Sequence, residues 1–170
     1  MNLPQIGIVA KGDEEMFWKL LDNRLELCFE ALMCRYKALK GTLSDESPIH
    51  WQHGAIARLK SGEVIDSLLE GGYSTISLGY IGVYEATKLM TGVSHVDPKG
   101  EQFALQLMKY LKAATTRWKK ETGLGFGLYG SPAESLCYRF AKIDQAKFGD
   151  IEDITDKGYC ATRCNLKIVA

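Results

Sequence analysis

One apolar stripe, which runs from about Asp13 to Lys40, constrains the fold of this 170-residue chain more than any other feature. Its apolar side chains recur at steps of three and four residues, which is the period of an α-helix. They are Phe17, Leu21, Leu25, Cys28, Leu32, Tyr36 and Leu39. Asp13 is placed to cap the start of the helix, and Gly41 to end it. Such a helix would be roughly 40 Å long, so we expect it to lie along the flank of something larger.

Strand-like and helix-like segments alternate through the rest of the chain. We expect strands at 73–78 and 125–129 and helices at about 81–90, 98–120 and 131–149, and the tail 159–170 is compatible with a strand. Asp97 and Pro98 are typical of a helix start, with Asp97 as the cap. Short connections between strand and helix predict parallel strands with crossover helices, in a helix-rich α/β fold. We find no internal repeat or linker, so we expect a single domain over residues 1–170.

Charge and hydropathy exclude several classes of partner. The 21 Lys and Arg residues balance 21 Asp and Glu residues, so we expect no nucleic-acid partner and no membrane partner. No apolar run approaches the roughly 18 residues of a membrane helix. The first residues lack the pattern of a signal peptide. These observations predict a cytoplasmic location, and they leave room for a small anionic ligand in a local pocket.

The residues that most often hold metals give weak signals here. The five cysteines are odd in number and scattered, which argues against a disulfide framework. Cys28, Cys34 and Cys137 lie in apolar helical patterns, so we expect them to be buried. Neither the His50/His53 pair nor the Cys160/Cys164 pair has the further ligands of a metal site, and we expect no metal. The acidic residues near the C-terminus are most simply a solvated face: Asp144, Asp150, Glu152, Asp153 and Asp156.

The segment after the second strand has the local sequence of a phosphate loop. Gly130 allows a tight turn, and Ser131 can cap the helix that follows. The first turn of that helix would point the backbone N–H groups of Ala133, Glu134 and Ser135 toward an anion. The same residues support a purely structural interpretation, because Ser131 and Glu134 form a capping box and Glu134 would repel a phosphate. The residues alone leave both interpretations open, a phosphate site and a structural helix cap.

The segment after the first strand gives a similar but weaker signal. A ligand could approach the backbone near Ser77, Leu78 and Gly79, helped by Gly79 and Gly82, or these glycines could serve only a tight strand-to-helix turn. No dinucleotide-binding or Walker motif is present. The residues and their spacing identify no catalytic group.

Several ordered motifs nevertheless resemble the anaerobic (class III) ribonucleoside-triphosphate reductases. The segment 74–85 resembles G-Y-S-T-I-S-L-G-Y-x-G-L-Y-E of that family, and 129–136 resembles its Y-G-T-P-A-E-S-L loop, with Ser131 in place of Thr. Residues 2–6, 11–14 and 154–159 continue the resemblance, which covers residue 1 to about 159. The last eleven residues or so, from 160 to 170, depart from the family pattern.

The resemblance implies part of a ten-stranded α/β barrel of the glycyl-radical and ribonucleotide reductase type. Enzymes of this family reduce ribonucleoside triphosphates for deoxyribonucleotide biosynthesis, with a glycyl radical, a thiyl radical and formate as reductant. An iron–sulfur activating enzyme generates the radical, ATP and deoxynucleotides regulate the enzyme, and a structural zinc is bound. The family's radical-bearing cysteine and glycine motifs and its zinc-binding cysteine pairs do not occur in these residues. We therefore expect this chain to carry no catalytic residue or cofactor and to be inactive alone.

The resemblance also suggests a role within the barrel. It places Gly130, Ser131, Ala133, Glu134 and Ser135 at the loop that holds the substrate phosphates, with Ser77, Leu78 and Gly79 as candidates near the substrate. The expected partners are a ribonucleoside triphosphate, the remainder of the reductase or a second copy of the chain, and the activating enzyme. The alternative is a non-catalytic remnant or interaction module that keeps the fold.

Overall fold

A computed structural model describes residues 1–131 and 134–158 of the chain. Helix dominates, as the sequence predicts. The elements are α1 (Leu3–Ala10), α2 (Glu14–Leu39), the 3-10 helix η1 (Ser44–Glu46), α3 (Pro48–Trp51), α4 (Asp66–Leu69), β1 (Ile76–Tyr80), α5 (Val83–Thr91), α6 (Pro98–Thr122), β2 (Phe126–Gly130) and α7 (Glu134–Phe148). The tail from 159 to 170 and Ala133 lie outside the described residues. None of the described helices is both long and apolar enough to cross a bilayer.

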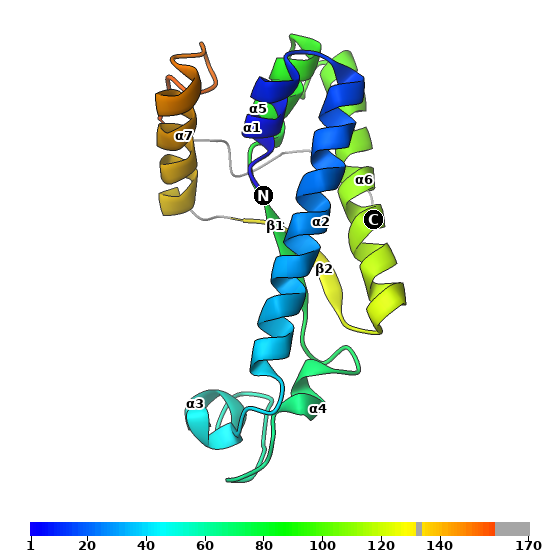
Figure 1. Ribbon diagram of the computed structural model, residues 1–170, viewed down its shortest axis with the longest axis vertical. Coiled ribbons are helices and arrows are strands. Elements are labelled where there is room, and N and C mark those ends of the chain that lie inside the picture. Colours follow the sequence, from blue (N-terminus) through cyan, green and yellow to red (C-terminus); the bar gives the residue numbers. More distant parts are fainter. Residues whose placement is uncertain (132–133, 159–170) are drawn as a thin grey trace.

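The two strands pair in parallel, which confirms the expected α/β arrangement. Ile76 lies opposite Phe126, and the register continues to Tyr80 opposite Gly130. The chain crosses from one strand to the other through α5 and α6, and Figure 1 shows both strands beside these helices and α2. Both strands therefore end at the same edge of the sheet.

The hydrophobic core lies between α2, α6 and one face of the sheet. Phe17 near the start of α2 contacts Phe103 near the start of α6, and Phe29 contacts Trp118 further along both helices. The two long helices thus run side by side in the same direction (Figure 1). Trp118 also contacts Phe126 of β2. The apolar stripe of α2 is buried against these partners, as its period predicts.

Capping explains where the helices begin. Asp13 accepts a hydrogen bond from the backbone N–H of Met16 at 2.9 Å, which confirms it as the cap of α2. Asp97 behaves differently from the sequence prediction. It makes no side-chain cap to α6, and its carboxylate instead accepts from the N–H of Ser94 in the preceding loop.

Helix α1, which the sequence analysis does not predict, attaches the start of the chain to the end of β1. The N–H of Ile81 donates to the carbonyl of Met1 at 3.1 Å, and the N–H of Leu3 donates to the carbonyl of Ile81 at 3.3 Å. Helix α1 then packs on α5, where Gly7 lies against Leu89 closely enough that a Cβ would meet it at 3.0 Å. The small size of Gly7 sets this close approach.

Three side chains occupy environments that differ from the sequence predictions. Cys34 is exposed on α2, although the pattern predicts burial. Asp144 is almost fully buried and hydrogen bonded, and Asp153 lies in an ion-pair cluster. The acidic stretch is therefore not a uniformly solvated face. The predictions for Asp144 and Asp153 failed because these residues have partners in distant parts of the chain.

Candidate functional site

The carboxyl ends of β1 and β2 form the candidate site. Tyr80 and Gly130 are paired at this edge, and the backbone N–H of Ser131 donates to the carbonyl of Tyr80 at 3.1 Å. Helix α5 follows β1 after two residues, and α7 follows β2 after three. Ligands of parallel α/β sheets bind at such an edge, where strands end and helices begin. Sequence motifs from two distant segments thus come together here.

The two faces of the sheet differ sharply in composition. One face carries apolar side chains that pack against α2 and α6: Ile76, Leu78, Phe126 and Leu128. Because side chains alternate along a strand, the opposite face carries Ser77, Gly79, Gly127 and Tyr129. Tyr129 is 52% exposed on this face. The face opposite α2 and α6 therefore offers mostly backbone and small side chains to a ligand.

The structure brings the two predicted groups of site residues into contact. A Cβ added at Gly79 would lie 3.8 Å from the Cβ of Ser131. Gly130 is the last residue of β2, and Ser135 is exposed in the first turn of α7. Leu78 packs in the core with 2% of its surface exposed, so only its backbone can face a ligand.

Glycine is required where β1 turns into α5. Gly82 adopts φ +80°, in the left-handed region that residues with a Cβ rarely adopt. An added Cβ would lie 2.2 Å from Cγ of Pro4, which is too close for any real contact. The turn beside the candidate site is thus built around the start of α1.

Helix α7 attaches to the rest of the molecule through a narrow stripe. Cys137 and Ala141 pack against Ile81, the residue that follows β1. One turn further, Asp144 is 1% exposed and accepts hydrogen bonds from Asn2 Nδ2 and Gln5 Nε2, both at 2.7 Å. Sequence analysis missed this contact. The spacing of Asp144 from Cys137 and Ala141, which places all three on one helix face, is the signal that could have found it.

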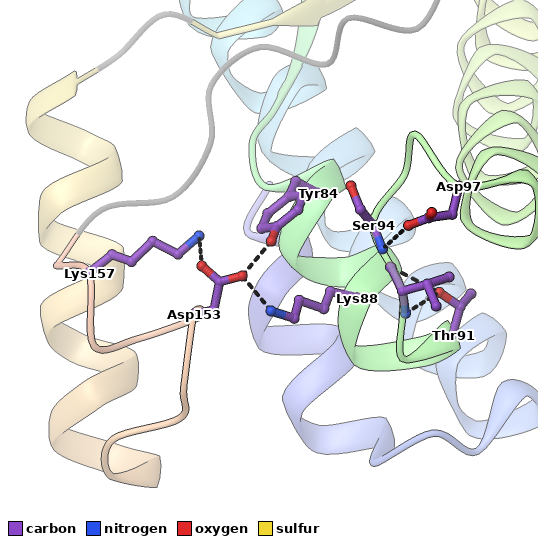
Figure 2. A network of polar contacts seen from close by, with 8 residues as sticks. Tyr84, Lys88, Thr91, Ser94, Asp97, Asp153 and Lys157 are labelled. Carbon is purple, nitrogen blue, oxygen red and sulfur yellow. Dashed lines mark hydrogen bonds and ion pairs between the residues drawn. The ribbon is translucent and has the colours of Figure 1, made fainter.

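A second polar cluster ties the segment after α7 to α5. Asp153 accepts from Lys157 at 2.8 Å, and from Lys88 and the hydroxyl of Tyr84 on its other oxygen (Figure 2). Lys157, Lys88 and Tyr84 together hold the pKa of the Asp153 carboxyl well below its usual value. The Asp153 hydrogen bond raises the pKa of Tyr84. Because Asp153 joins Lys88 and Tyr84 of α5 to Lys157, this cluster clamps the segment after α7 onto α5.

The described residues offer no metal centre. Within 1–131 and 134–158, no group of three or more His, Cys, Asp or Glu side chains is placed to hold a metal ion. His50, for example, has its Nδ1 2.7 Å from the hydroxyl of Ser47. The family's structural zinc therefore does not fit the residues that the structure describes.

Comparison with known proteins agrees with this architecture. The model of the family described as anaerobic ribonucleoside-triphosphate reductase matches residues 1–168, a range that includes most of the tail. The chain is 41% identical to the anaerobic ribonucleoside-triphosphate reductase of Salmonella typhimurium, over 99% of this chain and 24% of that protein. It is 40% identical to that of Enterobacteria phage T4, over 94% of this chain and 26% of that protein. The chain thus spans about a quarter of the length of these relatives.

Solved structures show the same fold. A Thermotoga maritima anaerobic ribonucleotide reductase with dATP bound in the specificity site matches 87% of this chain and 24% of its own, with a TM-score of 0.69 and 24% identity. A second structure of that enzyme, in complex with dATP and CTP, matches 88% of this chain and 24% of its own, with a TM-score of 0.68 and 22% identity.

Proposed function

We propose, because the chain belongs to the anaerobic ribonucleoside-triphosphate reductase family, that it forms part of the catalytic barrel of such a reductase. The complete enzyme would reduce ribonucleoside triphosphates to deoxyribonucleoside triphosphates. Within it, this chain would supply the strand ends and the helix start that hold the triphosphate of the substrate.

The observation that carries this proposal is the in-register parallel pairing of β1 and β2, with a helix after each strand. Helices α2 and α6 cover one face of the pair. In a closed α/β barrel the helices lie outside, so the other face, with Ser77, Gly79 and Tyr129, would face the interior. The edge where Tyr80 and Gly130 end would then open onto the interior, where a substrate binds.

The start of α7 supplies the attraction for phosphate in this proposal. The N-terminus of a helix carries partial positive charge and backbone N–H groups that have no partner within the helix. The N–H of Ser131 is used by Tyr80, so the donors would come from the first turn of α7, which includes Ser135. Glu134 is the first residue of this helix.

Radical chemistry would come from the remainder of the enzyme. A glycyl radical and a thiyl radical, both outside these residues, would supply the unpaired electron that abstracts a hydrogen atom from the substrate, with formate as reductant. We assign no step of that chemistry to this chain, whose part is to bind and orient. The activating enzyme, the nucleotide effectors and the zinc belong, in this proposal, to contacts outside these residues.

Titration with sodium tripolyphosphate, followed by backbone amide NMR of the full chain, tests the phosphate site. We expect shifts at Gly130, Ser131 and Ser135, with a Kd on the order of millimolar (about −4 kcal/mol) because water competes for exposed N–H groups. Sodium chloride at matched ionic strength is the control. If the amide signals of residues 130–136 do not shift while others do, the interaction-module alternative would be favoured.

A pair of charge variants sharpens this test. Ser135→Glu places a negative charge beside the phosphate, whereas Ala146→Glu places the same charge on an exposed position at the far end of α7. Repulsion of about 1 kcal/mol between charges 4 Å apart in water predicts a roughly fivefold weaker Kd for Ser135→Glu only. Equal effects of the two variants would contradict the proposed location.

A further inference from the structure

We propose that Asp144 is a positioning residue, which sets the place of the α7 N-terminus relative to the ends of β1 and β2. This inference rests on the proposed phosphate site, because it names the contact that positions the helix whose N-terminus forms that site. Asp144 lies in the second half of α7 and would touch no substrate. It acts through the helix that carries it.

The environment of Asp144 is unusual for a carboxylate. It is 1% exposed, and its two oxygens accept from two neutral amides, Asn2 Nδ2 and Gln5 Nε2, each at 2.7 Å. A buried carboxylate is costly unless such hydrogen bonds replace water. The arrangement therefore holds only where both amides reach the carboxylate together.

The apolar part of the α7 interface, although it includes the half-buried Phe140, is otherwise built from small side chains and is less directional than the hydrogen bonds of Asp144. The buried apolar residues beside Asp144 are small, Cys137 and Ala141, whereas Tyr138 and Ile143 are 57% and 48% exposed. Small apolar contacts allow a helix to slide or turn at little cost. A slip by one helical turn, about 5.4 Å, would move the carboxylate off both donors and leave it buried without partners. Asp144 is thus a directional contact that ties the position of α7 along its axis to α1, in addition to the Asp153 clamp on the segment that follows the helix.

A continuous chain of contacts links Asp144 to the site. Asn2 pairs with Ile81 in a parallel bridge, and Ile81 directly follows the last residue of β1. Asn2 also caps α1 by accepting from the N–H of Gln5 at 3.4 Å, which orients the Asn2 side chain. At the other end of the loop, Ser131 is bonded to Tyr80. The end of β1 therefore holds both sides of the connection into α7: Ser131 before it by a direct hydrogen bond, and α7 after it through Asp144 and Asn2. In Figure 1, α7 otherwise stands to one side of α1.

Residual dipolar couplings, which report the orientation of α7 amides relative to those of α1 and α5, test the inference without any ligand. We expect Asp144→Leu to change the orientation of α7. Cys137→Ala removes packing from the same stripe but leaves the amide contacts, so it should keep the native orientation. An unchanged orientation in Asp144→Leu, or an equal change in both variants, would overturn the inference.

A swapped pair provides the rescue. Asp144→Asn alone replaces one carboxylate oxygen, an acceptor, by an NH2 group, a donor, so that a donor faces the amide of Gln5. Gln5→Glu combined with Asp144→Asn places a carboxylate acceptor opposite this new donor. We expect the single variant to weaken tripolyphosphate binding about tenfold, a change comparable to the net contribution of one hydrogen bond. The double variant should restore the binding. A swap that restores the unfolding midpoint but not the α7 orientation would overturn positioning and leave only a structural role.

The two readouts separate this inference from the function on which it rests. If the unsubstituted chain fails to bind tripolyphosphate, the phosphate site is refuted, and the dipolar couplings still decide whether Asp144 sets the helix orientation. If the chain binds tripolyphosphate and Asp144→Asn binds it equally well, the positioning role is refuted and the phosphate site stands.

Discussion

Replacement of Gly82 by alanine tests how the turn after β1 is built. Two costs add at this position. A Cβ at φ +80° carries the left-handed penalty of about 1–2 kcal/mol, offset by about 0.4–1 kcal/mol because alanine restricts the unfolded chain. The clash with Cγ of Pro4 at 2.2 Å adds about 1–3 kcal/mol, the usual cost of overpacking. The expected loss of unfolding free energy is therefore roughly 1–5 kcal/mol.

The chain offers a matched control at the other end of the same helix. Gly92 ends α5 at φ +76°, and an added Cβ there would meet nothing within 4 Å. Gly92→Ala should thus pay only the backbone penalty, about 1 kcal/mol. Urea denaturation followed by circular dichroism measures both losses. The difference between the variants isolates the contact with α1.

A double variant checks the assigned cause. Pro4→Ala removes the two ring carbons that the new Cβ would strike, so Gly82→Ala should cost about 1–3 kcal/mol less in that background than in the native chain. Equal losses for Gly82→Ala and Gly92→Ala, or full additivity with Pro4→Ala, would refute the packing argument and leave only backbone strain.

Three further predictions follow from the fold. Lys157 and Lys88 depress the pKa of Asp153, so the stabilisation that they provide is complete above the pKa of 3.8 that Asp153 has in the unfolded chain, and it is lost as the pH falls toward the pKa in the folded chain. The difference in urea midpoint between the native chain and Asp153→Asn should therefore shrink below about pH 4. A difference that stays constant with pH would contradict the ion pairs of this cluster. Leu107→Ala, at a fully buried site of α6, should lower the unfolding free energy by about 2–5 kcal/mol, measured in urea. Within the described residues β1 and β2 each leave one edge without a strand partner, so the isolated chain should self-associate in light scattering as concentration rises, and a monomer at all concentrations would argue against this.

The long elements could be predicted from sequence because their determinants are local. Helix α2 begins one residue after its predicted cap, Asp13, and α6 begins at Pro98 as expected. Helix α1 was missed for a physical reason. Six of its eight residues are buried, so it has no polar face and no amphipathic period. Asn2 followed by Pro4, a cap and an early proline, is the local signal that marks its start.

The candidate site likewise has one part that local sequence patterns predict and one part that they do not. That two strand-to-helix segments meet follows from parallel pairing, which the alternation of elements predicts. The role of Asp144 follows only in part: its spacing from Cys137 and Ala141 places it on the packed face of α7, but its donors lie 142 and 139 residues away and no local pattern identifies them. The same holds for Asp153, whose partner Lys88 is 65 residues distant. An acidic residue on a helix is normally solvated, and only the folded chain shows which ones are enclosed.

The attachment of α1 to Ile81 has a consequence during protein synthesis. Leu3 must wait for a partner 78 residues later in the chain, and Asn2 must wait 142 residues for Asp144. At ribosomal rates of about 5–20 residues per second, these intervals are roughly 4–16 s and 7–28 s. During that time helix α1, six of whose eight residues become buried in the fold, lacks the partner helix α5 on which it packs. Nascent-chain chaperones that bind short apolar segments would therefore hold Leu3–Ala10, and release would be timed by the appearance of α5.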